Sequence, residues 1–299
     1  MTDVVTLSKA PSLLGAYGKA AVAAVPMAGK IPGIPGGGGR IPTAVRRLEG
    51  VRLGASQLAE LRKVTEDTTA GLPLFAPHLL AFPLHMAGMT DGAFPYPAIG
   101  TVHLDNVVER REAIAEDALL DLEVRFVGPF AHRKGATFQI ETEAFVSGKL
   151  VWREVSTMLR VGARTKNEEE AELPALPEGD EPGAGAAQTE WKLAPTLGRS
   201  YAAVSGDRNP IHMSDLTAKP FGFPKAIIHG MWTAARLGAA FGDALPEAVS
   251  LAVRFERPIL LPATVQLLRW QAAANTDLLV RSSSGEKVHA RARLTPLAG

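Results

Sequence analysis

The sequence predicts an α+β fold made of two similar units in tandem. Each half has one apolar helical stretch, which is followed by segments in which apolar and polar residues alternate. Strict alternation is the pattern of half-buried strands, and one helix followed by several such strands is typical of an antiparallel α+β sheet. The same order of segments occurs twice, which indicates an internal duplication.

The elements follow the same course in both halves. In the first half, the stretch 72–87 is expected to be a turn-rich entry that leads into a short apolar helix, and strands are expected at 100–110, 120–126, 136–145 and 150–159. In the second half, a helix is expected at 227–241, with strands at 248–258, 264–270, 277–281 and 287–294. Residues 146–149 and 282–285 are expected to form hairpin turns of the same kind. The phrases at 124–129 and 253–258 resemble each other and are taken as corresponding strands.

Length and composition limit the possible functions. A chain of 299 residues has room for two modest domains, and 46% hydrophobic with 21% charged residues is ordinary for a globular protein. The net charge of +1 and the lack of a dense Lys/Arg run give no basis for nucleic-acid binding. The chain has no cysteine, which excludes disulfides, zinc–thiolate sites and a cysteine nucleophile.

Composition changes along the chain suggest four regions. These are a Gly/Pro-rich extension at 1–45, a first unit at 46–165, an acidic Pro/Gly linker at 166–190 and a second unit at 191–299. The apolar stretch at 13–27 is interrupted by Lys19 and Pro26 and is shorter than the roughly 20 residues that cross a membrane. The first residues lack the basic start of a secretory signal, so we expect a cytoplasmic protein with no membrane span.

The segment with the most chemistry is Tyr-x-x-x-Ser-Gly-Asp-x-Asn-Pro-Ile-His at 201–212. Gly206 and Pro210 are turn formers, so a bend is expected here. A bend can direct Asp207 and His212 toward one point, where a carboxylate and a neutral imidazole could hold a water and move its protons. The same residue types also occur in ordinary surface turns, where Asp207 would be only a capping residue.

A second segment, Ile-His-Gly-Met-Trp at 228–232, marks the expected start of the second apolar helix. The first N–H groups of a helix have no partner within the helix and carry partial positive charge. The N–H groups around Gly230 are therefore candidates to stabilise a developing oxyanion.

The first motif resembles the signature of the MaoC-like, R-specific enoyl-thioester hydratases, the hydratase 2 family. The resemblance covers most of residues 190–295, and the Ile-His-Gly-Met segment falls where that family begins its central helix. It implies a double hot-dog fold, in which each unit is a curved antiparallel sheet around a central helix. The first half has no Gly-Asp-x-Asn-Pro-x-His bend, which implies one active site per chain and a first half that receives the acyl tail. His78, His85 and Asp91 of that half are interpreted as structural.

The resemblance also implies a reaction, which is the reversible hydration of trans-2-enoyl thioesters and dehydration of (R)-3-hydroxyacyl thioesters in fatty-acid metabolism. Asp207 and His212 would hold the water, and the sequence leaves open which of them is the base because coupled groups titrate as a pair. Asn209 would fix the bend, and Ser205 would hydrogen-bond Asp207. No metal, flavin or nucleotide cofactor is needed.

The expected partner is an acyl-CoA or acyl-carrier-protein thioester. Ile228, His229 and Met231 surround the helix start and are expected to contact it. Arg254 and Arg257 are candidates for the carrier phosphates, since guanidinium groups match phosphate geometry.

Two alternatives remain at this point. One is a non-catalytic protein of the same fold that binds acyl thioesters, which the intact Asp207 and His212 disfavour. The other is an acyl-thioesterase, which usually has a carboxylate on the central helix, and the stretch from His229 to Phe241 contains none. The sequence does not decide between a monomer and a homodimer.

Overall fold

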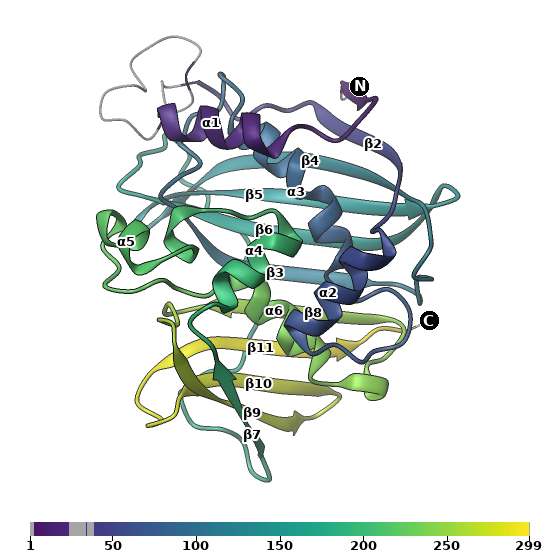
Figure 1. Cartoon of the computed structure of the whole chain (residues 1–299), viewed down its shortest axis with the longest axis vertical. Helices are drawn as coiled ribbons and strands as arrows, with labels where there is room; N and C mark the ends of the chain where they lie inside the picture. The colour runs from purple at the N-terminus through teal and green to yellow at the C-terminus, as the bar shows by residue number, and fades with distance from the viewer. Residues whose placement is uncertain (1–2, 24–33, 35–38, 299) are drawn as a thin grey trace. The chain divides into compact units, whose positions relative to one another are not determined.

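The computed structural model describes residues 3–23, 34 and 39–298 of the chain (Figure 1). Contacts divide it into two compact units. The first comprises Met1–Arg52, Pro77–Leu104 and Ala118–Leu173, and the second comprises Leu53–Ala76, Asp105–Asp117 and Pro174–Gly299. No helix within the described residues is long and apolar enough to cross a membrane.

The sheet of the first unit is built from strands that precede and strands that follow its central helix in the sequence. In order across the sheet the strands are β1 (Val4–Leu7), β2 (Val45–Val51), β4 (Leu120–His132), β5 (Gly135–Val146) and β6 (Lys149–Val161). β1 runs parallel to β2, and the other neighbours are antiparallel. The helices of this unit are α1 (Leu13–Ala23) and α3 (Ala76–Met89). The strand β3 (Thr101–Arg110) begins in the first unit, and its residues from Asp105 onward belong to the second.

The central helix of the first unit is α3, and it packs directly on β4. A Cβ atom at Gly88 would lie only 2.1 Å from Cε2 of Phe126, so a larger residue would displace either this ring or the helix. The ring of Phe126 continues into a cluster with Phe94 at 5.5 Å between centroids, and Phe94 contacts Phe138 at 5.1 Å. These edge-to-face contacts fill the core between helix and sheet.

The second unit has the same organisation. Its sheet contains β7 (Ala187–Leu193), β9 (Ala263–Ala272), β10 (Asn275–Ser282), β11 (Val288–Pro296) and β8 (Val249–Phe255) in that order, and β8 also pairs with Asp105–Arg110 of β3. Its helices are α2 (Ala55–Thr65), α4 (Leu197–Ser205), the short α5 (Asp215–Ala218) and the central α6 (Gly230–Ala239). Short 3-10 turns occur at η2 (Pro210–His212), η3 (Lys219–Phe221) and η4 (Gly242–Ala244).

The segment 53–76 covers the central helix of this second unit. The indole N–H of Trp232 on α6 donates to the carbonyl of Val64 at 2.8 Å. A Cβ atom at Gly238 would lie 3.5 Å from Leu74 and 3.7 Å from Leu251 of β8. The helix therefore lies between its sheet on one side and residues 53–76 on the other.

The predicted architecture of two tandem hot-dog units is confirmed. Along the chain, β2, α3 and β3 to β6 repeat as β7, α6 and β8 to β11, and the sheet neighbours β2-β4-β5-β6 repeat as β7-β9-β10-β11. The paired phrases were misleading, however, because 124–129 lies on β4 and 253–255 lies on β8, which take different places in this order. A shared Val-Arg-Phe reflects a common strand pattern more than a common position.

The two predicted hairpin turns also differ. The turn at 146–149 is a two-residue connection with positive φ at Ser147 (50°) and Gly148 (80°), which suits the twist of the flanking strands. The other turn is longer, because the N–H of Ser282 bonds the carbonyl of Lys287 and the loop spans 283–287.

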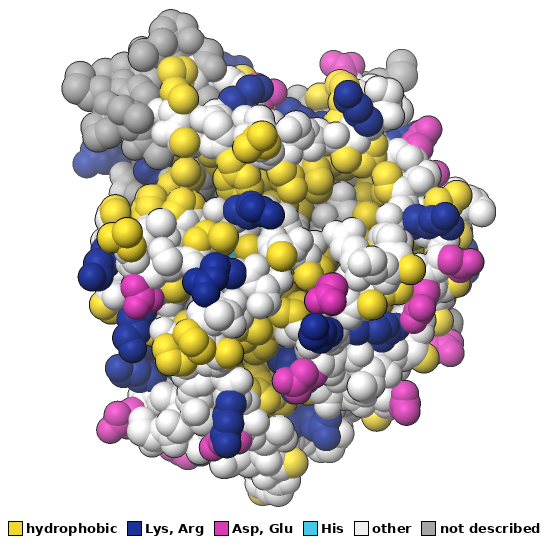
Figure 2. Space-filling model, in the orientation of Figure 1, with side chains coloured by type: hydrophobic (Ala, Val, Ile, Leu, Met, Phe, Trp, Pro, Cys, Tyr) yellow, Lys and Arg dark blue, Asp and Glu magenta, His cyan; other side chains and the backbone are white. Residues whose placement is uncertain are grey.

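The N-terminal extension and the acidic linker both form structure where they are described. The N-terminal extension contributes β1 and α1, and its residues 24–33 and 35–38 lie outside the described residues. The acidic linker bonds each unit: the N–H of Ala131 donates to Glu169 at 2.7 Å, and Asp180 forms an ion pair with Arg291. Acidic and basic side chains are interspersed on the face shown in Figure 2.

Candidate active site

The bend at 205–212 connects α4 to a short 3-10 turn. α4 ends at Gly206, whose φ of 78° is in the left-handed region that favours glycine. The side-chain oxygen of Asn209 accepts the N–H of Ile211 at 3.5 Å and caps the turn Pro210–His212. The N–H of His212 also donates to the carbonyl of Asn209 at 3.0 Å. Asn209 therefore holds the backbone that carries His212.

Asp207 is held from two directions. One of its carboxylate oxygens accepts the N–H of Asn209 at 3.1 Å. Its backbone N–H donates to the hydroxyl of Ser205 at 3.2 Å, and that hydroxyl donates to the carbonyl of Tyr201 at 2.9 Å. Ser205 was expected to bond Asp207, and in this geometry it bonds the backbone rather than the carboxylate. The carboxylate is 29% exposed, so substrate could reach it.

His212 is held in one tautomer. Its Nδ1 lies 2.9 Å from the carbonyl oxygen of Ile227. A carbonyl can only accept, so Nδ1 carries the proton and Nε2 carries the lone pair. Burial lowers the pKa of His212, an effect that the charge of Asp207 partly opposes. The ring is therefore neutral near pH 7, with a basic nitrogen available.

His229 is a member of this cluster that the sequence placed only among the residues contacting substrate. Its ring stacks on that of His212 with centroids 3.6 Å apart and planes 24° apart. Its Nε2 donates to the backbone carbonyl of Asp207 at 2.9 Å. Burial, reinforced by neighbouring His212, lowers the pKa of His229 to about 3. The signal that could have revealed it is a histidine in an otherwise apolar run, directly before the helix that carries Gly230.

The start of α6 lies next to this cluster because His229 is its N-cap residue. The first N–H groups of a helix have no intrahelical partner, and no side chain caps them at this end of α6. A Cβ atom at Gly230 would lie 3.3 Å from the ring of Phe255, tighter than most real contacts. A glycine here lets the first turn of the helix lie close against that ring. The arrangement brings together a carboxylate, a neutral imidazole and unpaired helix N–H groups.

The same cluster also has the composition of a metal site. Single ligand atoms of Asp207, His212 and His229 all lie within 4.8 Å of one another. Imidazole lone pairs lie in the ring plane, and nitrogen ligands must converge on a metal at about 2.0–2.1 Å. Two rings stacked almost parallel direct their lone pairs side by side, so they do not converge on one ion. The geometry fits proton transfer better than metal binding.

The remaining residues expected to bind substrate differ in how far they are exposed to solvent. Ile228 and Met231 are buried, and the N–H of Ile228 bonds the carbonyl of Ile259 at 3.0 Å. The guanidinium of Arg254 donates to buried Asp105 at 2.8 Å. Arg257 is exposed, and its backbone carbonyl is 3.2 Å from Nδ1 of His289. Of the two arginines, Arg257 has the more accessible side chain.

Comparisons with known proteins agree with the hot-dog architecture. The family model described as "MaoC like domain" matches residues 179–288. The 3-hydroxyacyl-thioester dehydratase X of Mycobacterium tuberculosis is 34% identical over 226 residues, covering 76% of this chain and 79% of that protein. The chain belongs to the MaoC-like dehydratase family.

Solved structures give the same result. The crystal structure of HtdX of Mycobacterium tuberculosis matches with a TM-score of 0.71 and 31% identity, over 85% of this chain and all of that one. A MaoC-like dehydratase from Phytophthora capsici matches with a TM-score of 0.73 over 86% of this chain and 96% of that one. Its identity is only 18%, so this second likeness concerns the fold alone.

Proposed function

We propose that the protein is a hydro-lyase that hydrates trans-2-enoyl thioesters and, in reverse, dehydrates (R)-3-hydroxyacyl thioesters in fatty-acid metabolism. The observation that carries this proposal is the position of Asp207 and the neutral His212 beside the uncapped start of α6. The name of the Mycobacterium tuberculosis relative, a 3-hydroxyacyl-thioester dehydratase, supports the same reaction class.

The proposed reaction uses each group for one part of the charge movement. A water held by Asp207 and His212 attacks C3 of the enoyl group as one of the two accepts its proton. The C2=C3 electrons move toward the thioester oxygen, which becomes an enolate oxygen. The N–H groups at Gly230 stabilise that charge, since preorganised donors act on charge as it develops. A proton then returns to C2 on the same face, and reversal of these steps gives dehydration.

The tautomer of His212 favours it as the proton acceptor. Its Nδ1–H is fixed by Ile227, so Nε2 is the only ring nitrogen with a lone pair. Asp207 then holds the water and stabilises the imidazolium that forms. His229 positions both, because it stacks on the ring of His212 and donates to the backbone of Asp207.

The carrier and the acyl pocket are further parts of the proposal. The exposed Arg257 is the better of the two arginines for a carrier phosphate, because the guanidinium of Arg254 is already bonded to buried Asp105. Ile228, His229 and Met231 border the start of α6, where the thioester would lie. CoA and acyl carrier protein both carry a phosphate and remain alternative carriers.

The test is the ultraviolet absorbance of a trans-2-enoyl-CoA series, from crotonyl to dodecenoyl. The wild-type protein should remove the conjugated enoyl absorbance. Asp207→Asn disables the Asp207–His212 pair by removing the charge that stabilises the imidazolium, and should slow the reaction by about 10²–10⁴-fold, the range of general acid–base catalysis. Asp243→Asn is the matched control, since it removes the same charge from an exposed position after α6 and should act like the wild type.

Other outcomes point to other functions. Release of free thiol would identify a thioesterase. If no chain length reacts, the acyl carrier protein thioesters are tested in the same way. Binding without turnover of those substrates as well would leave a non-catalytic thioester-binding protein.

A further inference from the structure

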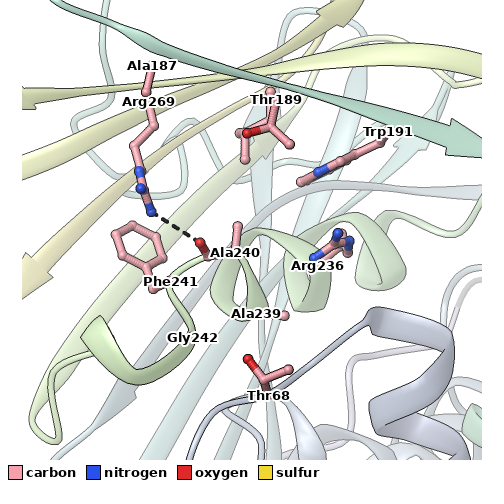
Figure 3. A pocket seen from close by; sticks show the side chains of 11 residues that line it. Thr68, Ala187, Thr189, Trp191, Arg236, Ala239, Ala240, Phe241, Gly242 and Arg269 are labelled. Carbon is pink, nitrogen blue, oxygen red and sulfur yellow. Dashed lines mark hydrogen bonds between the residues drawn. The ribbon is translucent and has the colours of Figure 1, made fainter.

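A pocket lies within the second unit, at the C-terminal end of α6. The candidate active site is at the N-terminal end of the same helix. The volume of the pocket is about 320 Å³. α6 rises about 1.5 Å per residue, so Ala239 is about 13 Å along the axis from Gly230. Figure 3 shows the residues that surround it. They come from the loop after α2, the end of α6, and strands β7 and β9: Thr68, Ala187, Thr189, Trp191, Arg236 and Ala239, with residues 240–242, Leu267 and Arg269.

The ionisable side chains that line this pocket are both arginines. No lining residue carries a carboxylate. Arg236 forms an ion pair with Glu66, whose side chain is 74% exposed, and its own side chain is only 12% exposed. Within the described residues Arg269 has no salt bridge, and its guanidinium donates to the carbonyl of Ala240 at 3.1 Å (Figure 3). The lining therefore carries an excess of positive charge.

Both guanidinium groups are held in place before any ligand arrives. Arg236 lies over the ring of Trp191 and Arg269 over the ring of Phe241, each at 5.1 Å from the centroid. Such cation–π contacts fix the plane of a guanidinium, and the N–H groups that do not bond Glu66 or Ala240 can still donate to a ligand. Burial lowers the pKa of Arg236, which means that its charge is incompletely solvated. A preorganised and partly desolvated cation binds an anion at less entropic cost than a flexible surface side chain.

The chemistry of the lining identifies the ligand class. Guanidinium groups form paired hydrogen bonds with carboxylate and phosphate groups, and Thr68 and Thr189 add hydroxyl groups at the same pocket. The volume is at the lower end of the range for small-molecule sites, roughly 300–1,000 Å³. We propose that this pocket binds a small organic anion through a carboxylate or phosphate group, with Arg236 and Arg269 as its principal contacts.

The test is isothermal titration calorimetry at constant ionic strength, with pyrophosphate and citrate as separate probes and glycerol as the neutral control. One of the two anions should bind saturably at one site per chain, and which one binds distinguishes phosphate from carboxylate recognition. Arg236→Gln and Arg269→Gln should each weaken binding at least tenfold. Arg281→Gln is the matched control, because this strand arginine bonds Gln266 and does not line the pocket.

A steric variant keeps the test valid if an arginine variant loses stability. Ala187→Phe retains both arginines but fills the mouth of the pocket, where Ala187 is exposed, and it should abolish binding. Melting curves without ligand identify any variant that fails to fold. Equal affinity in the wild type and all three pocket variants, or no saturable binding of either anion, would overturn the proposal. Hydration of enoyl thioesters is measured separately, so failure of that activity leaves this result unaffected.

Discussion

Each hot-dog unit places two histidines and an acid at its central helix, but the two clusters differ in access to solvent. In the second unit, Asp207 is 29% exposed beside the stacked pair His212 and His229. In the first, Glu154 is fully buried, and both of its carboxylate oxygens lie within 2.9 Å of Nδ1 of His78. The same residue types therefore form a solvent-accessible candidate site in one unit and an enclosed polar contact in the other.

The buried cluster of the first unit makes further contacts of its own. Nε2 of His85 lies 2.7 Å from the hydroxyl of Thr142, and the rings of His78 and His85 meet edge to face at 5.3 Å. Burial lowers the pKa of His85 to about 3, as it does for His229. A low histidine pKa therefore marks burial in both units, and the exposure of the acid is what separates a candidate site from a structural contact.

The largest effect is expected from breaking the enclosed contact. His78→Leu removes the ring nitrogen that both carboxylate oxygens of buried Glu154 contact, which should lower the free energy of unfolding by about 3–5 kcal/mol. The turnover of folded protein should change little. Urea denaturation measures the free energy of unfolding, and the enoyl assay measures turnover. His132→Leu, at an accessible position, is the control. A large loss of turnover without loss of stability would show that the first cluster takes part in the reaction.

Acid should destabilise both units through their buried histidines. The folded pKa values of His85 and His229 are about 3, below the ordinary value of 6.5. Between these values the unfolded chain binds protons that the folded chain does not. The contribution of each neutral histidine to the free energy of unfolding is therefore fully present above pH 6.5. Below that pH it falls by about 1.4 kcal/mol per pH unit for each histidine. Urea denaturation from pH 7 to 4.5 measures the slope, and His85→Gln or His229→Gln should each reduce it. An unchanged slope in both variants would contradict this assignment.

A moderate effect on catalysis is expected at His229. His229→Leu removes the hydrogen bond to the carbonyl of Asp207, worth about 1–1.4 kcal/mol, so kcat should fall about tenfold with little change in KM. His229→Gln retains a donor and should restore part of the rate. Parallel losses in KM and stability, with no rescue by glutamine, would instead indicate a purely structural role.

The smallest effect is expected at Ser205. Ser205→Ala removes the acceptor for the N–H of Asp207 and should cost about 1 kcal/mol in stability or an equivalent loss in kcat. Ser200→Ala is the matched control on the same helix, where the hydroxyl is exposed. Equal behaviour of the two variants would mean that Ser205 does not position Asp207.

The sequence predicted the parts of this protein that depend on local patterns. Alternation located most strands, and turn chemistry located the bend that carries Asp207 and His212. The role of His229 was not predicted, because its contact with His212 depends on how the start of α6 meets the bend at 227–229. The bond between Arg254 and Asp105 was also missed, since it joins strands that are distant in sequence. Register and stacking arise from tertiary packing, which periodicity does not encode.

The membership of residues 53–76 in the second unit has a consequence for how the chain is made. These residues leave the ribosome early, yet the partners of Val64 and Leu74, namely Trp232 and Gly238, are synthesised much later. The sheet of this unit is also incomplete until β11 (Val288–Pro296) has been made, because β11 lies between β8 and β10. The second unit therefore cannot form its full core from its C-terminal residues alone, because residues 53–76 pack on its central helix. A gene cut at the acidic linker would separate this half from the segment that covers its central helix.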